Sequence, residues 1–200
     1  MKTKEKILLT ALEMFNETNT QAVTTNHIAK QMGISPGNLH YHYKNREEII
    51  RLLYIQMRDS LILPTDDLPQ SIQELVEHQK LIHEVSWNYR FFQRELLFLL
   101  SRDQELKELY IKDNIAHRER IILSYKNFIA NGYLDIPYEN ILDYLADSVI
   151  MNIQFWNPLL VTLGRPSDKH SFEAAIQRTN ELLRPFLTQK ALKELAKLEF

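Results

Sequence analysis

Apolar residues recur every three or four positions along most of the chain, and no stretch alternates regularly between apolar and polar residues. This spacing places apolar side chains on one face of a helix, whereas regular alternation is typical of strands. Only four glycines and seven prolines interrupt the 200 residues, and both residue types disfavour helix interiors. The sequence therefore predicts an all-α protein.

Prolines and glycines divide the pattern into separate helices. We expect a first helix over residues 3–16, two short helices within residues 24–46, and a fourth over residues 46–63 that ends at Pro64. The segment 64–69 then separates these four helices from the rest. The remaining helices are expected near residues 70–86, 89–101, 104–131, 138–157 and 168–188, with a short amphipathic piece over residues 190–200.

Residues 24–46 predict two helices joined by a tight turn. Gly33 tolerates positive φ at little cost, as a short connection between steeply crossing helices requires. Thr24 or Thr25 can cap the first helix, and Ser35 can cap the second, with Pro36 at its first position. The residues that bury one side of the pair are Ile28, Met32, Ile34, Leu39 and Tyr43, with the small Ala29 at the crossing.

The outward face of the second short helix carries hydrogen-bond donors, cations and flat rings. No Asp or Glu occurs between Glu17 and Glu47, although the formal net charge of the whole chain is −2. A surface that faces phosphates needs such an absence. Asn38 can read a base edge, and the other groups can hold phosphates. The candidate DNA contacts are Thr25, Ser35, Pro36, Gly37, Asn38, His40, Tyr41, His42, Lys44 and Arg46.

Three groups of residues in the first quarter of the chain form a specific motif. They are Ile7, Leu8, Ala11, Leu12 and Phe15; then Thr24, Thr25, Ile28 and Ala29; then Gly33, Ile34, Ser35, Gly37, Leu39, Tyr41, His42, Tyr43, Lys44, Arg46 and Glu47. With this motif, residues 3 to about 55 resemble the DNA-binding domain of the tetracycline-repressor (TetR) family of bacterial transcriptional regulators. His40, Tyr43 and Arg46 stand where the family usually has Tyr, Phe and Lys, and each keeps a ring or a cation. The resemblance implies a three-helix DNA-binding domain over residues 1–48 and a helical bundle for ligand binding and dimerisation over residues 49–200.

Charge, cysteine content and the longest uncharged stretch bear on the binding partner and on the cellular location. Residues 1–60 contain eight Lys and Arg against six Asp and Glu, so the N-terminal part is the one suited to a polyanion. The absence of cysteine excludes disulfides and thiolate metal sites and fits a reducing cytoplasm. The longest uncharged stretch, residues 148–164, contains Asn152, Gln154, Asn157 and Pro158, which favours a buried helix ending near the proline over a membrane span. We therefore expect a soluble cytoplasmic protein without a membrane segment.

The helix expected over residues 138–157 is apolar on more than one side. One stripe is Leu142, Leu145, Val149, Ile153 and Trp156, and another is Ile141, Tyr144, Met151 and Phe155. Such a helix is covered on two sides. The resemblance implies that the chain's own core forms one cover and a second subunit the other, and the first stripe is the candidate dimer interface. The alternative is a central core helix of a monomer.

The resemblance also implies a pocket for a small-molecule effector in the C-terminal part. Asp113 and His117 lie one turn apart and interrupt an otherwise apolar helix face, so they can hold a polar ligand group. They can equally satisfy each other, or pair with Arg90 or Arg94, and the aromatic residues can equally be core. The candidate effector contacts are Trp87, Tyr89, Arg90, Phe91, Tyr110, Asp113, His117, Ile121, Tyr125 and Trp156.

No catalytic constellation is recognisable in the sequence. Glu74 and His78 share a helix face, but His83 lies about 140° from His78 on a helix, so the three do not form one metal-binding face. A glycine-rich phosphate loop, a nucleophile elbow and a cysteine nucleophile are all missing. We expect neither a cofactor, nor a metal, nor enzymatic activity, although an all-α enzyme with a fortuitous helix-turn-helix is a third possibility.

These features together predict a homodimeric, ligand-responsive transcriptional regulator. We expect a repressor that occupies a palindromic operator in double-stranded DNA and is released by a small molecule. An activator or adaptor with the same DNA-binding domain is the alternative.

Overall fold

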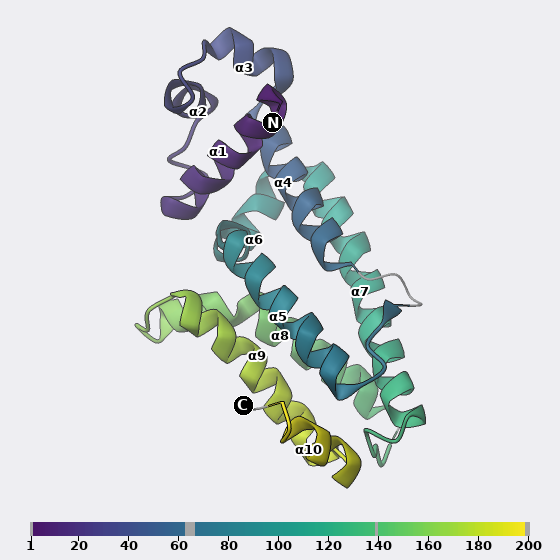
Figure 1. Ribbon diagram of the computed structural model, residues 1–200. Coiled ribbons are helices and arrows are strands. Elements are labelled where there is room, and N and C mark those ends of the chain that lie inside the picture. Colours follow the sequence, from purple (N-terminus) through teal and green to yellow (C-terminus); the bar gives the residue numbers. More distant parts are fainter. Residues whose placement is uncertain (1, 63–66, 139, 199–200) are drawn as a thin grey trace. The chain divides into compact units, whose positions relative to one another are not determined.

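The computed structural model describes residues 2–62, 67–138 and 140–198, and it consists of helices (Figure 1). The helices are α1 (Thr3–Glu17), α2 (Thr25–Gln31), α3 (Pro36–His42), α4 (Arg46–Leu61), α5 (Ile72–Asn88), α6 (Arg90–Arg102), α7 (Gln104–Ala130), α8 (Ile141–Thr162), α9 (Lys169–Leu183), the 3-10 helix η2 (Arg184–Phe186) and α10 (Gln189–Leu195). Leu134 and Leu187 form an isolated bridge, and no strand occurs in the described ranges. The prediction of an all-α protein is confirmed.

The predicted end of α8 near Pro158 is wrong. Pro158 lies inside the helix, which continues to Thr162, although proline removes one helix hydrogen bond. Trp156 and Leu160, on either side of the proline, pack with α9 in one apolar cluster, and this packing offsets the lost bond. The helix ends instead at Thr162, and Gly164, two residues later, has a φ of 64°, which suits a glycine.

Two other predicted boundaries need comment. The predicted helix over residues 168–188 is divided, because α9 ends at Leu183 and η2, which contains Pro185, precedes α10. The predicted stop of α4 at Pro64 falls within residues 63–66, which lie outside the described residues. The last described helical residue of α4 is Leu61.

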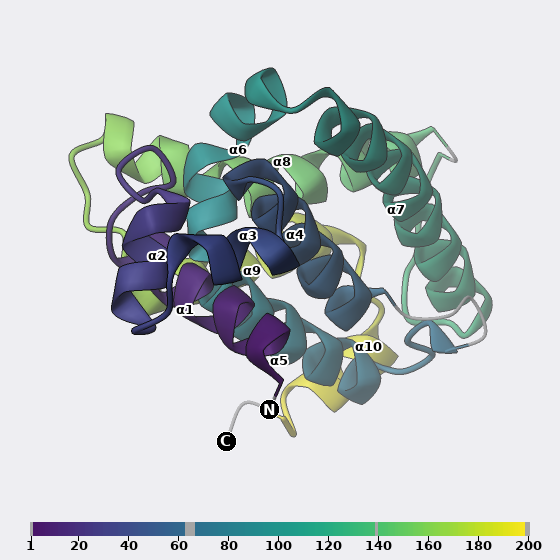
Figure 2. The ribbon, with the colours of Figure 1, turned by 90° about the horizontal axis from the view of Figure 1, so that it is seen from above.

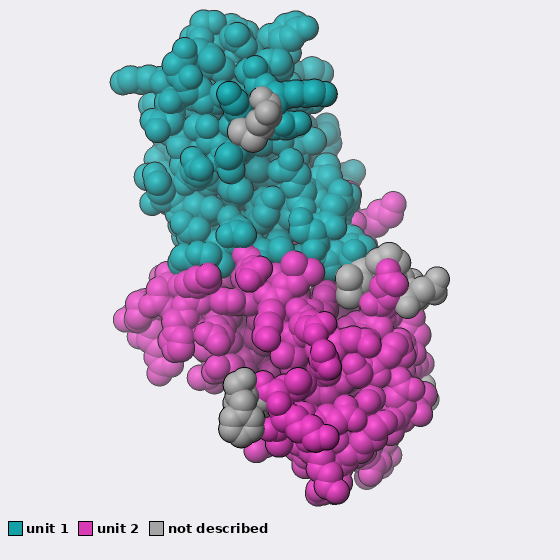
Figure 3. Space-filling view, in the orientation of Figure 1, with its two compact units in different colours: residues 1–62, 85–108 teal, residues 63–84, 109–200 magenta. Residues whose placement is uncertain are grey.

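Packing divides the chain into two compact units (Figure 3). Unit 1 comprises residues 1–62 and 85–108, and unit 2 comprises residues 63–84 and 109–200. Helices α5 and α7 each contribute residues to both units. A functional boundary is expected between residues 48 and 49, whereas packing groups α4 and α6 with the N-terminal helices.

Unit 1 has an aromatic core that joins its helices. The rings of Phe15 and Phe91 lie 5.4 Å apart between centroids, and those of Tyr54 and Phe92 stack at 5.0 Å. Polar groups hold the end of α1 in place, because the Asn16 side chain donates to the Asn88 carbonyl at 2.7 Å and accepts from the Phe91 amide at 3.1 Å. The end of α1 is therefore attached to the end of α5 and the start of α6.

Unit 2 is built on a core of side chains from α5, α7, α8, α9 and α10 and from the segment that follows α7. The buried members are Ile72, Tyr125, Phe128, Tyr133, Leu134, Leu142, Leu145, Val149, Leu183 and Ala191. Ion pairs join α7 to α8, since Arg118 contacts Asp147 at 2.6 Å and Asp143 at 2.7 Å. In the part of the chain that the structure describes, no helix is sufficiently long and apolar to cross a bilayer.

Candidate nucleic-acid interface

The turn between α2 and α3 has the geometry that the sequence predicts. Gly33 has a φ of 66°, a value that residues with a Cβ rarely adopt. The amide of Ile34 donates to the Ala29 carbonyl at 3.0 Å and closes the end of α2. Ile28 and Ala29 are fully buried, and Figures 1 and 2 show α1, α2 and α3 grouped together. The turn therefore places α3 against α2, and α2 packs on α1.

Helix α3 is capped at its start and anchored at its end. The Ser35 hydroxyl accepts from the Asn38 amide at 3.2 Å, and Pro36 occupies the first turn. At the other end the buried Tyr43 donates its hydroxyl to the Lys4 carbonyl at 2.9 Å. Burial, with the nearby carboxylates of Glu48 and Glu5, raises the pKa of Tyr43 to about 12, so this hydroxyl remains a donor at neutral pH.

Most of the predicted DNA contacts lie on the exposed side of this helix pair. Tyr41 is 85% exposed, and its ring meets that of His42 edge-on at 5.1 Å. Thr25 and His42 are half-buried. The exposed predicted contacts are Ser35, Pro36, Gly37, Asn38, His40, Tyr41 and Lys44.

Gly37 lies in the first turn of α3 without a structural need for glycine. A Cβ added there would meet only the Ser35 hydroxyl, at 3.9 Å, and the φ of Gly37 is not positive. Its small size therefore keeps the outer side of α3 open, and a partner can approach the backbone closely there.

Arg46 differs from the other predicted contacts. Its guanidinium donates to the Thr20 carbonyl at 2.6 Å and to the Glu47 carboxylate at 3.1 Å, and its side chain is 25% exposed. Thr20 is itself held by Glu95, which accepts from the Thr20 hydroxyl at 2.6 Å. The positive charge of Arg46 is thus used inside unit 1, whereas Lys44, two residues after α3, is exposed.

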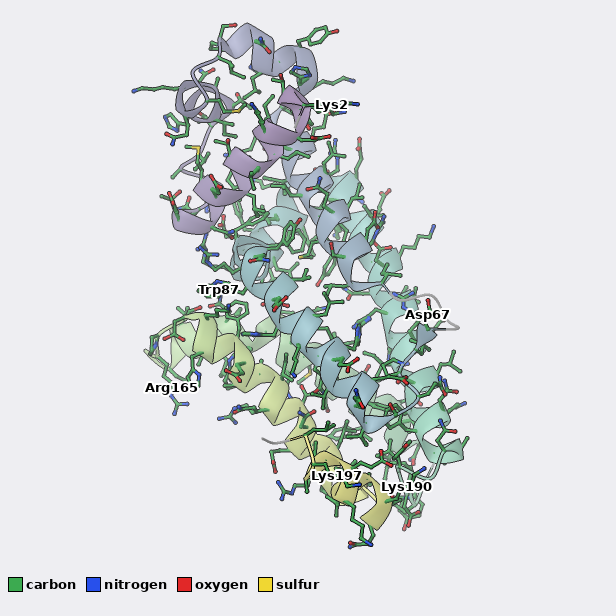
Figure 4. All side chains as sticks on the ribbon, viewed as in Figure 1. Lys2, Asp67, Trp87, Arg165, Lys190 and Lys197 are labelled. Atoms are coloured by element: carbon green, nitrogen blue, oxygen red, sulfur yellow. The ribbon has the colours of Figure 1, made fainter. Side chains whose placement is uncertain are left out.

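Four candidate effector contacts belong to unit 1. Trp87, labelled in Figure 4, lies at the end of α5. The guanidinium of Arg90 lies 4.5 Å from the centroid of the Trp87 ring and donates to the Trp87 carbonyl at 3.1 Å. Burial raises the pKa of Tyr89, and Phe91 is fully buried in the aromatic core. Among the described residues, Arg90 and Phe91 therefore have clear roles in packing.

The other six candidates belong to unit 2: Tyr110, Asp113, His117, Ile121, Tyr125 and Trp156. Trp156 donates its indole N–H to the Ser171 carbonyl at 2.6 Å and stacks under Arg178 at 4.7 Å, so it joins α8 to α9. Burial raises the pKa of Tyr110 to about 12 and also raises that of Tyr125.

His117 of α7 and His78 of α5 are half-buried imidazoles that interact electrostatically, which the sequence did not reveal. Burial lowers the pKa of His117 to about 4, with contributions from Arg120 and His78. Burial also lowers the pKa of His78, whose Nδ1 is buried and has no hydrogen-bond partner among the described residues. The sequence signal for the burial of His78 was the pair of apolar residues at i−3 and i+4 on its helix face, Leu75 and Ile82. Two uncharged imidazoles can bind a polar group of a ligand.

The predicted dimer stripe of α8 is placed inside unit 2. Leu142, Leu145, Val149 and Trp156 are 2–7% exposed and Ile153 is half-buried, so these side chains pack within the single chain and offer little surface to a second one. The outward residues of α8 are Tyr144, Met151, Phe155 and Leu159, which are 68%, 62%, 39% and 45% exposed. Within the described residues, no group of three or more His, Asp or Glu side chains is arranged to hold a metal.

Comparisons with known proteins match family models over residues 7–195. Residues 7–53 match the model of the family described as bacterial regulatory proteins, tetR family, and residues 54–195 match a family described as bacterial transcriptional repressor, TetR. An HTH-type transcriptional regulator of Staphylococcus aureus is 26% identical over 173 residues, which are 66% of this chain and 92% of that protein. The negative transcriptional regulator IcaR of the biofilm operon icaADBC, from Staphylococcus epidermidis, is 40% identical over 48 residues, 24% of this chain and 26% of that protein.

Solved structures share the fold. A TetR-family transcriptional regulator from Marinobacter aquaeolei has a TM-score of 0.88 and 29% identity, with 99% of this chain and 97% of that chain covered. The ketosteroid transcriptional regulator KstR2 of Mycobacterium tuberculosis has a TM-score of 0.68 and 20% identity, with 94% and 96% covered. The fold of the whole chain, and not only of its first helices, is thus shared with these regulators.

Proposed function

The chain belongs to the TetR family of bacterial transcriptional regulators, and from this premise we propose that it is a homodimeric repressor released from its operator by a small molecule. Regulators of this family bind DNA and respond to ligands. The residues 1–48 serve DNA binding in this proposal, and residues 49–200 serve ligand binding and dimerisation. The observation that carries the proposal is the exposed, acid-free face of α3.

The α3 face supports two kinds of DNA contact. Asn38 is exposed in the first turn of α3, where its amide can bond an adenine edge in the major groove. Lys44, the Tyr41 hydroxyl and the imidazoles of His40 and His42 suit phosphate oxygens. Arg46 supports DNA binding indirectly in this proposal, because its hydrogen bonds hold the Thr20 carbonyl and the start of α4.

The outward stripe of α8 supports a dimer. Tyr144, Met151 and Phe155 recur on one face of the helix and are exposed, and contiguous exposed apolar surface is typical of an interface. Two copies related by a two-fold axis read two half-sites about 34 Å apart, one turn of DNA. A palindromic operator follows from this symmetry.

The effector response requires a ligand that prefers one arrangement of the dimer, because equal affinity for both arrangements shifts no population. The buried and half-buried candidates of unit 2, above all His117, are the residues we propose to contact it. A regulator that acts on chromosomal DNA works in the cytoplasm, and we propose no catalytic step.

Selection of bound duplexes from a random DNA pool at low ionic strength tests DNA binding. A palindromic consensus is expected, and recovery of no sequence above background contradicts the proposal. Transcription from a promoter that carries the selected site then distinguishes a repressor from an activator. Lower transcription with the protein supports a repressor, in line with the name of the IcaR relative, and higher transcription supports the activator.

A further inference from the structure

A groove in unit 2 has a lining that includes neither His78 nor His117. Its volume is about 360 Å³, within the range of small-molecule pockets. Ile72, Leu75 and Val76 of α5 form one wall, Leu183 of α9 the other, and Leu187 and Leu195 contribute from the C-terminal part. Leu195 lies between Lys190 and Lys197, which Figure 4 labels on and just after α10. These six of the eleven lining residues are aliphatic, and the other five are polar: Gln79, Gln177, Asn180, Glu181 and Arg184.

Two side-chain amides face each other within this groove. Gln79 donates to the Asn180 oxygen at 2.6 Å, and Asn180 donates to the Gln79 oxygen at 3.2 Å. Each amide has two N–H donors and an oxygen with two lone pairs. After the mutual bonds, each still has one donor and one acceptor position for a ligand group.

The charges of the groove cancel. Glu181 and Arg184 are its ionisable lining residues, and they contact each other at 3.1 Å. An ionised ligand group would find no unpaired opposite charge among them, and its transfer into aliphatic surroundings is costly. We propose that the groove binds an aliphatic molecule with one uncharged hydrogen-bonding end, a primary amide or an alcohol.

Helix α5 gives this site a regulatory consequence, which rests on the proposed function. The groove is formed by the first turns of α5, and the last residue of the same continuous helix, Asn88, holds the Asn16 side chain at the end of α1. A ligand between α5 and α9 acts on a helix that is bonded directly to the DNA-binding part of the chain. Occupancy of the groove therefore alters operator affinity.

The test is a titration of the full-length protein with octanamide, followed by methyl NMR. The methyl signals of Ile72, Leu75, Val76 and Leu183 should shift, and octanoate should bind about ten-fold more weakly or worse because its charge is unmatched. The variant Val76→Trp fills the groove and should abolish the shifts. Glu77→Trp, on the exposed side of the same helix, is the matched control and should keep them.

A double variant provides a second test that does not depend on the folding of Val76→Trp. Gln79→Leu combined with Asn180→Leu keeps the approximate size of both side chains and should weaken octanamide about ten-fold, because its polar end is left unpaired. Shifts that persist in Val76→Trp, or equal affinity for octanoate, overturn the site. A change of oligomeric state in Val76→Trp assigns the groove to a partner chain and also overturns it.

Operator binding is measured separately by fluorescence anisotropy. Octanamide that shifts the methyl signals and lowers operator affinity in the wild type supports the complete inference. Shifts without any change in operator affinity contradict the regulatory consequence. Absence of DNA binding in every variant and in the wild type contradicts the proposed function while the groove titration still decides the ligand site.

Discussion

The outward faces of α3 and α8 are both left uncovered by the chain, but their chemistry is opposite. Helix α3 presents Asn38, His40 and Tyr41, and helix α8 presents Met151 and Phe155. Polar groups are well solvated in water, whereas exposed large apolar side chains leave favourable burial unused. The α3 face therefore suits a polar partner that binds and leaves, and the α8 stripe suits a partner that stays. DNA and a second copy of the chain fit these requirements.

The largest effect is expected from charging the α8 stripe. Met151→Glu combined with Phe155→Glu would bury two carboxylates in an apolar interface, which is strongly unfavourable. We expect monomers, and an operator affinity lower by about a hundred-fold or more because the two half-sites are no longer bound together. Light scattering after size exclusion gives the oligomeric state, and anisotropy gives the affinity.

The matched control for this double variant is Val161→Glu. Val161 is 65% exposed and lies on α8 away from the stripe, so its charge should leave dimerisation unchanged. A double variant that remains dimeric and binds DNA normally would remove α8 from the interface.

The next largest effects are expected from alanine substitutions at the two cations near α3, and they differ between Arg46 and Lys44. Arg46→Ala removes the donors to the Thr20 carbonyl and should lower the free energy of unfolding by about 1–3 kcal/mol. Lys44→Ala should leave stability unchanged and reduce the slope of log affinity against log salt by about 0.9, the value for one phosphate contact. Urea denaturation and anisotropy at several salt concentrations provide both measurements. If Arg46→Ala lowered the salt slope and left stability intact, Arg46 would be a DNA contact after all.

A smaller effect is expected from the imidazole of His117 in unit 2. The pKa of His117 is lowered from 6.5 to about 4 in the folded chain, so between these values the unfolded chain binds a proton that the folded chain does not. Stability therefore falls as the pH drops through this window. We expect a loss on the order of 1–2 kcal/mol between pH 7 and pH 5, measured by denaturation at each pH. His117→Leu should flatten this dependence, and an unchanged slope would exclude His117 as its source.

The smallest effects are expected from alanine substitutions at the two glycines of the helix pair, Gly33 and Gly37. Gly37→Ala should leave the fold unchanged, since nothing lies within 3.4 Å of the added Cβ, and should weaken operator binding several-fold if DNA approaches the α3 backbone. Gly33→Ala should instead destabilise unit 1 by about 1–2 kcal/mol, because its φ of 66° is unfavourable for alanine. Equal operator affinity of Gly37→Ala and the wild type would show that DNA does not approach there.

Local sequence was sufficient for the helix-turn-helix. The caps of α2 and α3 act over three residues, as in the bond from the Asn38 amide to the Ser35 hydroxyl, and Gly33 satisfies a requirement of its own backbone. Periodicity also gave the number and approximate extent of the long helices. The end of α8 could not be predicted in this way, because packing of Trp156 and Leu160 against α9 carries the helix past Pro158.

Long-range contacts determined the direction in which several predicted side chains point. The motif identifies Arg46 as a cation near α3, but its contact with Thr20 spans 26 residues. The imidazoles of His78 and His117 come from different helices, and only folding brings them near each other.

An all-helical chain and a polar, acid-free helix pair near its start follow from the amino-acid order alone, because capping, turn geometry and charge act between near neighbours. The same order also gives α8 two apolar stripes. Which stripe is core depends on the folded chain, because Leu145 and Met151 are similarly apolar and differ in what packs beside them. Burial is a property of neighbours that lie far apart along the chain, and periodicity alone contains no information about them.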